Sequence, residues 1–130
     1  LVDAHVIVNS RISVSEGHFI AESARQRVLR NHHVMDVMVH IDPEDDSKAR
    51  PNAHLPSRSK LLDHLSQRLD STVPLQSSVV LHYLDGKVDI EIFTEGLERK
   101  ELAALKLKSE QIVADDPWLR AIHIYQSVAQ

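Results

Sequence analysis

The first part of the chain combines two hydrophobic periodicities. Apolar residues fall at every second position over residues 2–8, which predicts a strand with one buried and one polar face. Ser13 and Glu16 have the spacing of a capping box, and a second alternating run covers about 34–41 and ends before Pro43. These patterns predict a strand–helix–strand unit with parallel strands and a right-handed crossover. The expected buried stripe of its helix consists of Gly17, Ile20, Ala21, Ala24 and Val28.

The rest of the chain contains a second set of helical and alternating patterns. Residues 47–58 are rich in Pro and charge and predict a linker, and leucines at helical spacing follow it. Two alternating runs then flank Asp85 and Gly86, a dipeptide typical of two-residue hairpins. We expect a helix over about 97–114 and a last strand over 119–128.

The two halves share one order of elements. "VDAHVIV", a helix and "VMVHID" in the first half correspond to "VDIEIFT", a helix and "AIHIYQ" in the second, where a helix and a strand also precede them. We predict an α+β chain of two degenerate helix–strand–strand–helix–strand copies, the first lacking its opening helix and strand. Because the chain begins at Leu1 inside a strand pattern, we expect it to be part of a longer protein. The alternative is an accidental similarity of two α+β units. The predicted boundaries are 1–46 for the partial first copy, 47–58 for the linker and 59–130 for the second copy.

Composition narrows the function classes. The 130 residues have a net charge of -4 and no basic patch, which argues against a nucleic-acid partner. The chain has no cysteine, so disulfides, thiolate zinc sites and a cysteine nucleophile are excluded. No apolar run is long enough to span a bilayer and no signal-peptide pattern is visible. Nine histidines are many for this length, so a site built from imidazole and carboxylate groups is not excluded by the composition.

Imidazoles and carboxylates gather on the polar sides of the first unit. His5 lies on the polar face of the first strand, His40 and Asp42 lie on the matching face of the second, and His18 falls near the start of the helix. Imidazole nitrogen and carboxylate oxygen are the ligands that zinc, cobalt, ferrous iron or manganese accept when no thiolate is available. The plainer interpretation is that each is a half-exposed surface residue, and the spacing alone leaves both interpretations open.

The second copy offers a weaker set of candidate ligands. Across the predicted hairpin turn, a histidine on one strand faces an aspartate on the other, and a glutamate and a further histidine share their face. No histidine opens its helix, and Tyr125 occupies the position that Asp42 has in the first copy. A solvated polar sheet face is the interpretation we prefer, with the second copy kept for packing or pairing. The candidate residues are His82, Asp89, Glu91 and His123.

The stretch "HVIV…SVSEGHFIAESARQRVL…VMVHIDPED", within residues 2–46, resembles the cytoplasmic C-terminal domain of the cation diffusion facilitator family, the divalent-metal/proton antiporters. The resemblance rests on the strand His5, the helix opening around His18, the "VHIDP" strand end and the intervals between the three histidines. It implies a metallochaperone-like, ferredoxin-like fold that dimerises beneath a transmembrane domain at the cytoplasmic face of the membrane. It also implies a regulatory divalent metal ion, with zinc as the expected ion, bound partly across or near the dimer interface. The ligands that it implies are His5, His18, His40 and Asp42.

The function expected from this resemblance is a cytosolic metal-sensing and dimerisation domain of a divalent-cation efflux transporter, for zinc, iron, cobalt, cadmium or manganese. Its partners would be a second copy of the chain and the transmembrane domain of the same transporter. One alternative is a metal-independent α+β module for protein interaction or oligomerisation. Another is a metal hydrolase that uses His40 and Asp42. The sequence has no Gly-rich phosphate loop, no H-E-x-x-H and no nucleophile beside a base, so we predict that the protein is not an enzyme.

Overall fold

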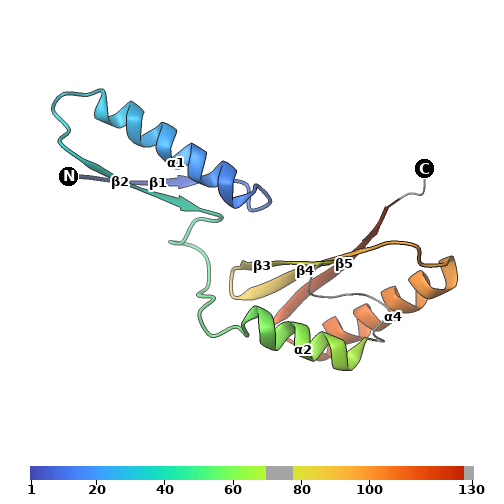
Figure 1. Cartoon of the computed structure of the whole chain (residues 1–130). Coiled ribbons are helices and arrows are strands. Elements are labelled where there is room, and N and C mark those ends of the chain that lie inside the picture. The colour runs from blue at the N-terminus through green and yellow to red at the C-terminus, as the bar shows by residue number, and fades with distance from the viewer. Residues whose placement is uncertain (70–77, 128–130) are drawn as a thin grey trace. The chain divides into compact units, whose positions relative to one another are not determined.

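The computed structural model describes residues 1–69 and 78–127 and divides the chain into two compact units, Leu1–Arg50 and Pro51–Gln130. Each unit has its own sheet, of two strands in the first unit and three in the second, and helices accompany both sheets (Figure 1). The prediction of an α+β fold is therefore confirmed. None of the helices over the described residues is both long and apolar enough to cross a membrane.

The first unit consists of β1 (Val2–Ile7), α1 (Val14–Leu29) and β2 (Val37–Asp42), and its two strands pair in parallel as predicted. Helix α1 begins where the capping pattern indicated, because the Ser13 hydroxyl accepts a hydrogen bond from the backbone N–H of Glu16 at 3.1 Å. Strand β2 starts at Val37, later than predicted. The reason is a turn, in which the Val34 backbone N–H donates to the Asn31 carbonyl at 2.9 Å.

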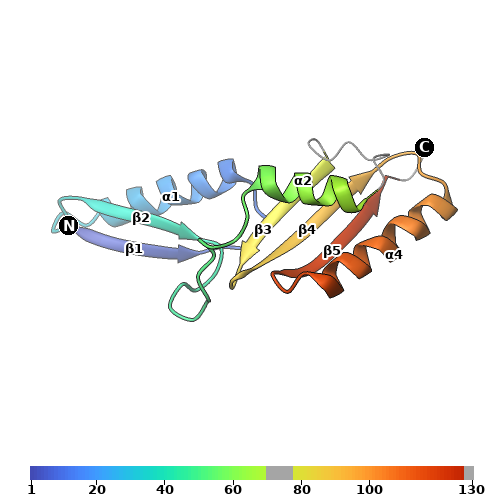
Figure 2. The same cartoon turned by 90° about the horizontal axis from the view of Figure 1, so that it is seen from below.

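Helix α1 covers one face of the two-stranded sheet (Figure 2). A Cβ atom added at Gly17 would lie 3.7 Å from Ile41 Cγ2, so helix and strand approach closely at this point. Because strand side chains alternate, the face with Ile41 also carries Val37 and Val39. The side chains of His40 and Asp42 therefore point to the opposite face.

The first unit buries few side chains. Over residues 1–50, all of which the structure describes, only Gly17 and Val37 are buried. A single helix on two strands leaves much apolar surface in contact with solvent, and such a small sheet is marginal by itself. The large apolar side chains exposed on this unit include Ile7, Val14, Phe19, Met35 and Met38.

The second unit has five elements in the order helix–strand–strand–helix–strand. Strand β4 lies between β3, with which it pairs antiparallel, and β5, with which it pairs in parallel. Both helices lie on one face of this sheet, an arrangement compatible with a ferredoxin-like fold (Figure 1). The order and pairing of its last three elements match those of the first unit, while the predicted duplication itself stays a prediction. The elements are α2 (Arg58–Arg68), β3 (Val79–Leu84), β4 (Lys87–Thr94), α4 (Arg99–Asp115) and β5 (Leu119–Gln126).

An aliphatic core lies between the helices and the sheet of the second unit. Leu61 and Leu65 of α2 are fully buried, as are Ile90 and Ile92 of β4. These side chains exclude water from one sheet face, so the opposite face receives the polar positions of the alternating strands. The buried apolar residues of the cluster are Leu61, Leu65, Leu69, Val79, Val88, Ile90, Ile92, Leu105, Ile112 and Leu119.

The hairpin between β3 and β4 has the predicted two-residue turn. Asp85 and Gly86 both adopt positive φ, at 50° and 75°, as a type I′ turn requires. Residues 51–57, part of the segment predicted as a linker, hold this hairpin. Asn52 accepts a hydrogen bond from the Gly86 backbone N–H at 2.7 Å and donates one to the Tyr83 carbonyl at 3.2 Å.

The last two elements agree with the predicted ones apart from their ends. Helix α4 begins at Arg99 because Glu98 and Glu101 form a reciprocal capping box, which sequence reasoning did not identify. Strand β5 ends at Gln126, and Val128, the predicted last strand residue, lies outside the described residues.

Candidate metal centre

The parallel register of β1 and β2 brings two histidines face to face. His5 pairs with His40, so both side chains leave the sheet on the face away from α1. Their imidazole rings are stacked, with centroids 4.4 Å apart and planes inclined by 8°. Strands β1 and β2 therefore each contribute one imidazole to the same site on this sheet face.

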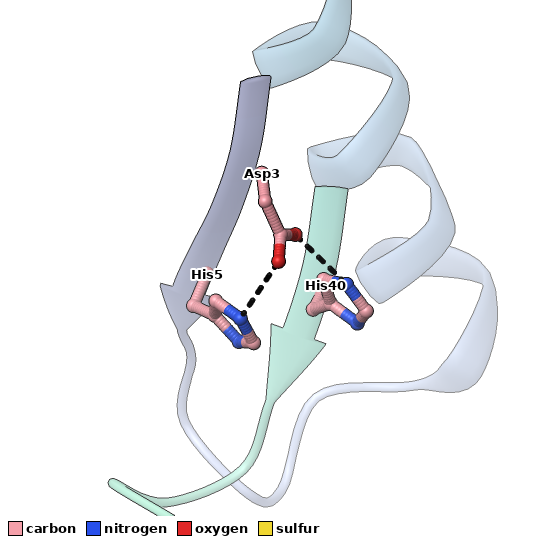
Figure 3. Close-up of side chains that lie close together, drawn as sticks. All are labelled: Asp3, His5 and His40. Carbon is pink, nitrogen blue, oxygen red and sulfur yellow. Dashed lines mark ion pairs between the residues drawn. The ribbon is translucent and has the colours of Figure 1, made fainter. Parts of the chain in front are cut away.

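Asp3 directs its carboxylate toward both of these rings (Figure 3). Its Oδ1 atom is 3.0 Å from His40 Nε2, and its Oδ2 atom is 3.8 Å from His5 Nε2. One donor atom from each of Asp3, His5 and His40 lies within 4.8 Å of the others. No other set of three histidines and acids in the described part of the chain comes as close. We refer to these three residues as the Asp3 cluster.

Asp42 approaches the same site from the other side of His5. Its Oδ2 atom is 3.0 Å from His5 Nδ1. This hydrogen bond is the largest of the effects that raise the pKa of His5 above its ordinary value of 6.5. The charges of Asp3, Asp42 and Asp46 raise this pKa further, while partial desolvation opposes them. The acids around His5 therefore favour positive charge at this place, either a proton or a metal cation.

The donors of the Asp3 cluster fit a borderline divalent cation. Zinc bonds of about 2.0 Å in tetrahedral geometry place neighbouring donor atoms roughly 3.3 Å apart. The two distances from Asp3, 3.0 Å from Oδ1 to His40 and 3.8 Å from Oδ2 to His5, involve different oxygens of the carboxylate and are of this order. Two imidazoles and one carboxylate leave a position open, and all three side chains have access to solvent. An ion could therefore enter directly and keep a water molecule or accept a further ligand.

The residues predicted for the first unit do not all come together. His5, His40 and Asp42 are neighbours, but His18 lies on α1, which covers the opposite face of the sheet. His18 Nε2 is 2.7 Å from Glu22 Oε1, and the ring lines a surface cavity of about 400 Å³ at the start of the helix. Within its own chain His18 does not join the other three.

The weaker candidate metal ligands in the second unit contact different partners and do not share one site. His82 Nε2 pairs with Glu91 Oε1. Asp89 is 3.4 Å from Arg120 Nη1 instead, and His123 is exposed beside the ring of Tyr125. The side chains of His82 and Glu91 are 11% and 9% exposed, so this pair offers little access to an ion. The structure therefore does not assemble these four side chains around one point.

Sequence reasoning did not select Asp3 as a ligand. The signal was available, because Asp3 precedes His5 by two positions and so shares its strand face. The alternation of polar and apolar residues does not give the register between β1 and β2. This register brings Asp3 close to His40 as well. An Asp-x-His pair on one parallel strand opposite a histidine on the next is the pattern that would have found it.

Comparison with known protein families relates this site to transport proteins. Residues 1–44 match the family model described as "Cation efflux protein, cytoplasmic domain". Searches among curated proteins and among solved structures found no match. The matched segment includes both strands and α1, and it confirms the resemblance noted in the sequence. Residues 1–44, which hold the Asp3 cluster and Asp42, are therefore similar to the cytoplasmic domain of cation efflux proteins.

Proposed function

We propose that the first unit binds a divalent cation on its histidine face and acts as the metal-sensing, dimerising cytoplasmic domain of a cation efflux transporter. The observation that carries this proposal is the Asp3 cluster, in which three ligand-type side chains from two strands converge. The family match at residues 1–44 supports the transporter context and dimerisation. Zinc is the ion that we propose first, because imidazole and carboxylate without thiolate suit it.

The surroundings of the cluster favour a second copy of the chain as the partner. Ile7 and Met38 lie on the same sheet face as the cluster and are 58% and 54% exposed. A copy placed over this face would remove these apolar side chains from water. It could also complete the coordination of the ion. His18, which faces away from the cluster in its own chain, is a ligand that the family resemblance would allow another copy to supply.

The negative charges on this sheet face would make association of two copies depend on a bound cation. Asp3 and Asp42 are both on the face that would be covered, so two copies without a cation would oppose like charges. A cation that binds between them offsets this repulsion and therefore binds the associated state more tightly than the separate one. This differential affinity is what a ligand needs in order to shift a conformational population.

Zinc titration of the full chain by calorimetry tests the proposal. We expect saturable binding by the wild type and a loss of at least about tenfold in affinity for His40→Ala, since one of three ligands is removed. His123→Ala is the matched control, because it removes an exposed strand histidine of the second unit and should leave the titration unchanged. Sedimentation with and without zinc should show zinc-dependent association.

Two results would contradict the proposal. A wild-type chain without saturable binding of zinc, or a His40→Ala variant that binds as well as the wild type, would exclude a metal centre at this face. Zinc-independent association together with absent binding would instead favour the metal-independent interaction module.

A further inference from the structure

The two edges of the three-stranded sheet in the second unit differ in how they are protected. On the outer edge of β3, side chains supply donors to the backbone. Arg58 Nη2 donates to the Val79 carbonyl at 2.9 Å, and the Asn52 side-chain amide donates to the Tyr83 carbonyl at 3.2 Å. The segment before β3 therefore covers this edge and blocks the addition of a further strand there.

The opposite edge, formed by β5, has no such cover among the residues that the structure describes. The Ser127 backbone N–H donates to the Thr94 carbonyl, and the Tyr125 carbonyl accepts from the Thr94 hydroxyl, both at 3.3 Å. Ser127 and Tyr125 thus direct their backbone groups to β4. Because these groups alternate in direction along a strand, those of Ile122 and Ile124 point away from the sheet.

A groove of about 230 Å³ lies along this edge, between β5 and α4. Figure 2 shows α4 beside β5, at the side of the sheet away from β3. Ile122 and Ile124 line the groove and also pack against the core. Lys106 and Glu110, one turn apart on α4, line it as well and are exposed. Apolar surface and one charge of each sign therefore accompany the outward backbone groups.

We propose that the outer edge of β5 is a self-association surface, to which β5 of a second copy of the chain adds as an antiparallel strand. In such a pair, outward-pointing residues meet outward-pointing residues, so Ile122 and Ile124 of each copy would exchange hydrogen bonds with those of the other. Residues 121–126 contain no proline, lysine or bulge that would keep the edge from pairing. This surface lies outside the unit that carries the proposed metal function, and it needs no ion.

The charges on α4 favour a second copy over an unrelated extended peptide. Two copies related by a two-fold axis would place their α4 helices side by side on one face of the joined sheet, in opposite directions. Lys106 of each copy would then face Glu110 of the other. A groove with one charge of each sign in this order is complementary to its own copy.

Amide hydrogen exchange of the full chain, followed by NMR with a chelator present, tests the pairing. The Ile122 and Ile124 amides should exchange fast in a dilute sample. They should slow about tenfold when about nine chains in ten are paired, since only the remaining tenth exchanges. The Tyr125 amide is the internal control, because it is directed to β4 and should be slow at both concentrations. Sedimentation at the same concentrations gives the paired fraction.

Charge reversal tests the choice of partner. Glu110→Lys should weaken the association about tenfold or more, because two symmetric attractions become repulsions. Lys106→Glu in the same chain should restore most of the association. Gln111→Lys is the matched control, since it adds a lysine at the next, exposed position of α4, which does not line the groove.

Several results would overturn this proposal. A chain that stays monomeric at every concentration, or one that associates without slower exchange at Ile122 and Ile124, would exclude pairing at this edge. Slower exchange of these amides only after addition of an unrelated extended peptide would assign the edge to another partner. A Glu110→Lys variant that associates like the wild type would exclude the facing α4 helices. None of these measurements involves zinc, so the proposed metal function stands or fails separately, and zinc-dependent association would add to the contact described here.

Discussion

At the scale of single residues, the His82–Glu91 pair explains why two of the weaker candidate ligands point at one another. Both side chains are about nine-tenths buried within the second unit. A carboxylate removed from water needs hydrogen-bond donors, because a buried charge without partners is costly. His82 Nε2 supplies such a donor to Glu91 from the neighbouring strand. We therefore expect the pair to contribute to the stability of the sheet.

Replacing His82 tests this interpretation. We expect His82→Ala to lower the free energy of unfolding of the second unit by about 2 kcal/mol, because Glu91 loses a charged hydrogen bond in a buried place. His82→Gln, whose amide can donate to Glu91, should cost less. The fluorescence of Trp118, the single tryptophan, reports urea unfolding of this unit.

The control for that experiment is His123→Ala, because His123 is exposed on the same sheet face. Its effect should stay within about 0.5 kcal/mol. If His82→Ala were equally harmless and instead abolished zinc binding, the pair would have to be regarded as part of a metal site.

At the scale of elements, the hairpin turn is a point where local backbone geometry determines strand pairing. Gly86 has a φ of 75°, in the left-handed region that disfavours residues with a Cβ atom. The same residue donates its backbone N–H to Asn52. The turn therefore joins β3 to β4 and also holds the segment that leads into α2.

Substitutions at Gly86 should follow backbone preference. Gly86→Ala should destabilise the second unit by about 1 kcal/mol, since alanine is strained at this φ. Gly86→Asn is the matched variant and should cost less, because asparagine tolerates the left-handed region. Urea unfolding followed by Trp118 fluorescence measures both, and equal costs for the two variants would contradict the explanation.

The elements that the sequence predicted well are those with local signals. The alternation in β1, β4 and β5, the cap at Ser13 and the turn at Asp85 depend on residues close in the chain. The start of β2 and the cap at Glu98 were missed, because an Asn31 turn and an acidic capping residue give weak sequence signals. For the candidate site, alternation placed His5, His40 and Asp42 on one polar face, whereas the contact between Asp3 and His40 depends on the register between strands.

At the scale of the whole molecule, the two units differ in how much they bury. The second unit has a cluster of fully buried leucines and isoleucines, while the first buries only Gly17 and Val37. The candidate metal centre is thus in the unit with less burial of its own. A ligand that binds only the folded state stabilises it by mass action. This contribution is relatively largest in a unit that gains little stability from buried apolar side chains.

Zinc should therefore stabilise the first unit selectively. At about 100 times the dissociation constant, the expected gain is about 2.7 kcal/mol. Amide hydrogen exchange should become slower in β1 and β2, and the Trp118 unfolding midpoint should not change. The His40→Ala variant is the control, since it should lose the protection by zinc. A rise of the Trp118 midpoint with unchanged exchange in β1 and β2 would contradict the location of the site.

The pairing of His5 with His40 has a consequence for how the first unit selects one alignment of its strands. A shift of β1 by one residue would carry His5 to the α1 face and bring Ala4 or Val6 opposite His40. Two short strands without a third neighbour have few other means to discriminate between such alignments. An ion held by both rings is compatible with one alignment only. Its binding would therefore stabilise the native register of the two strands over the shifted ones.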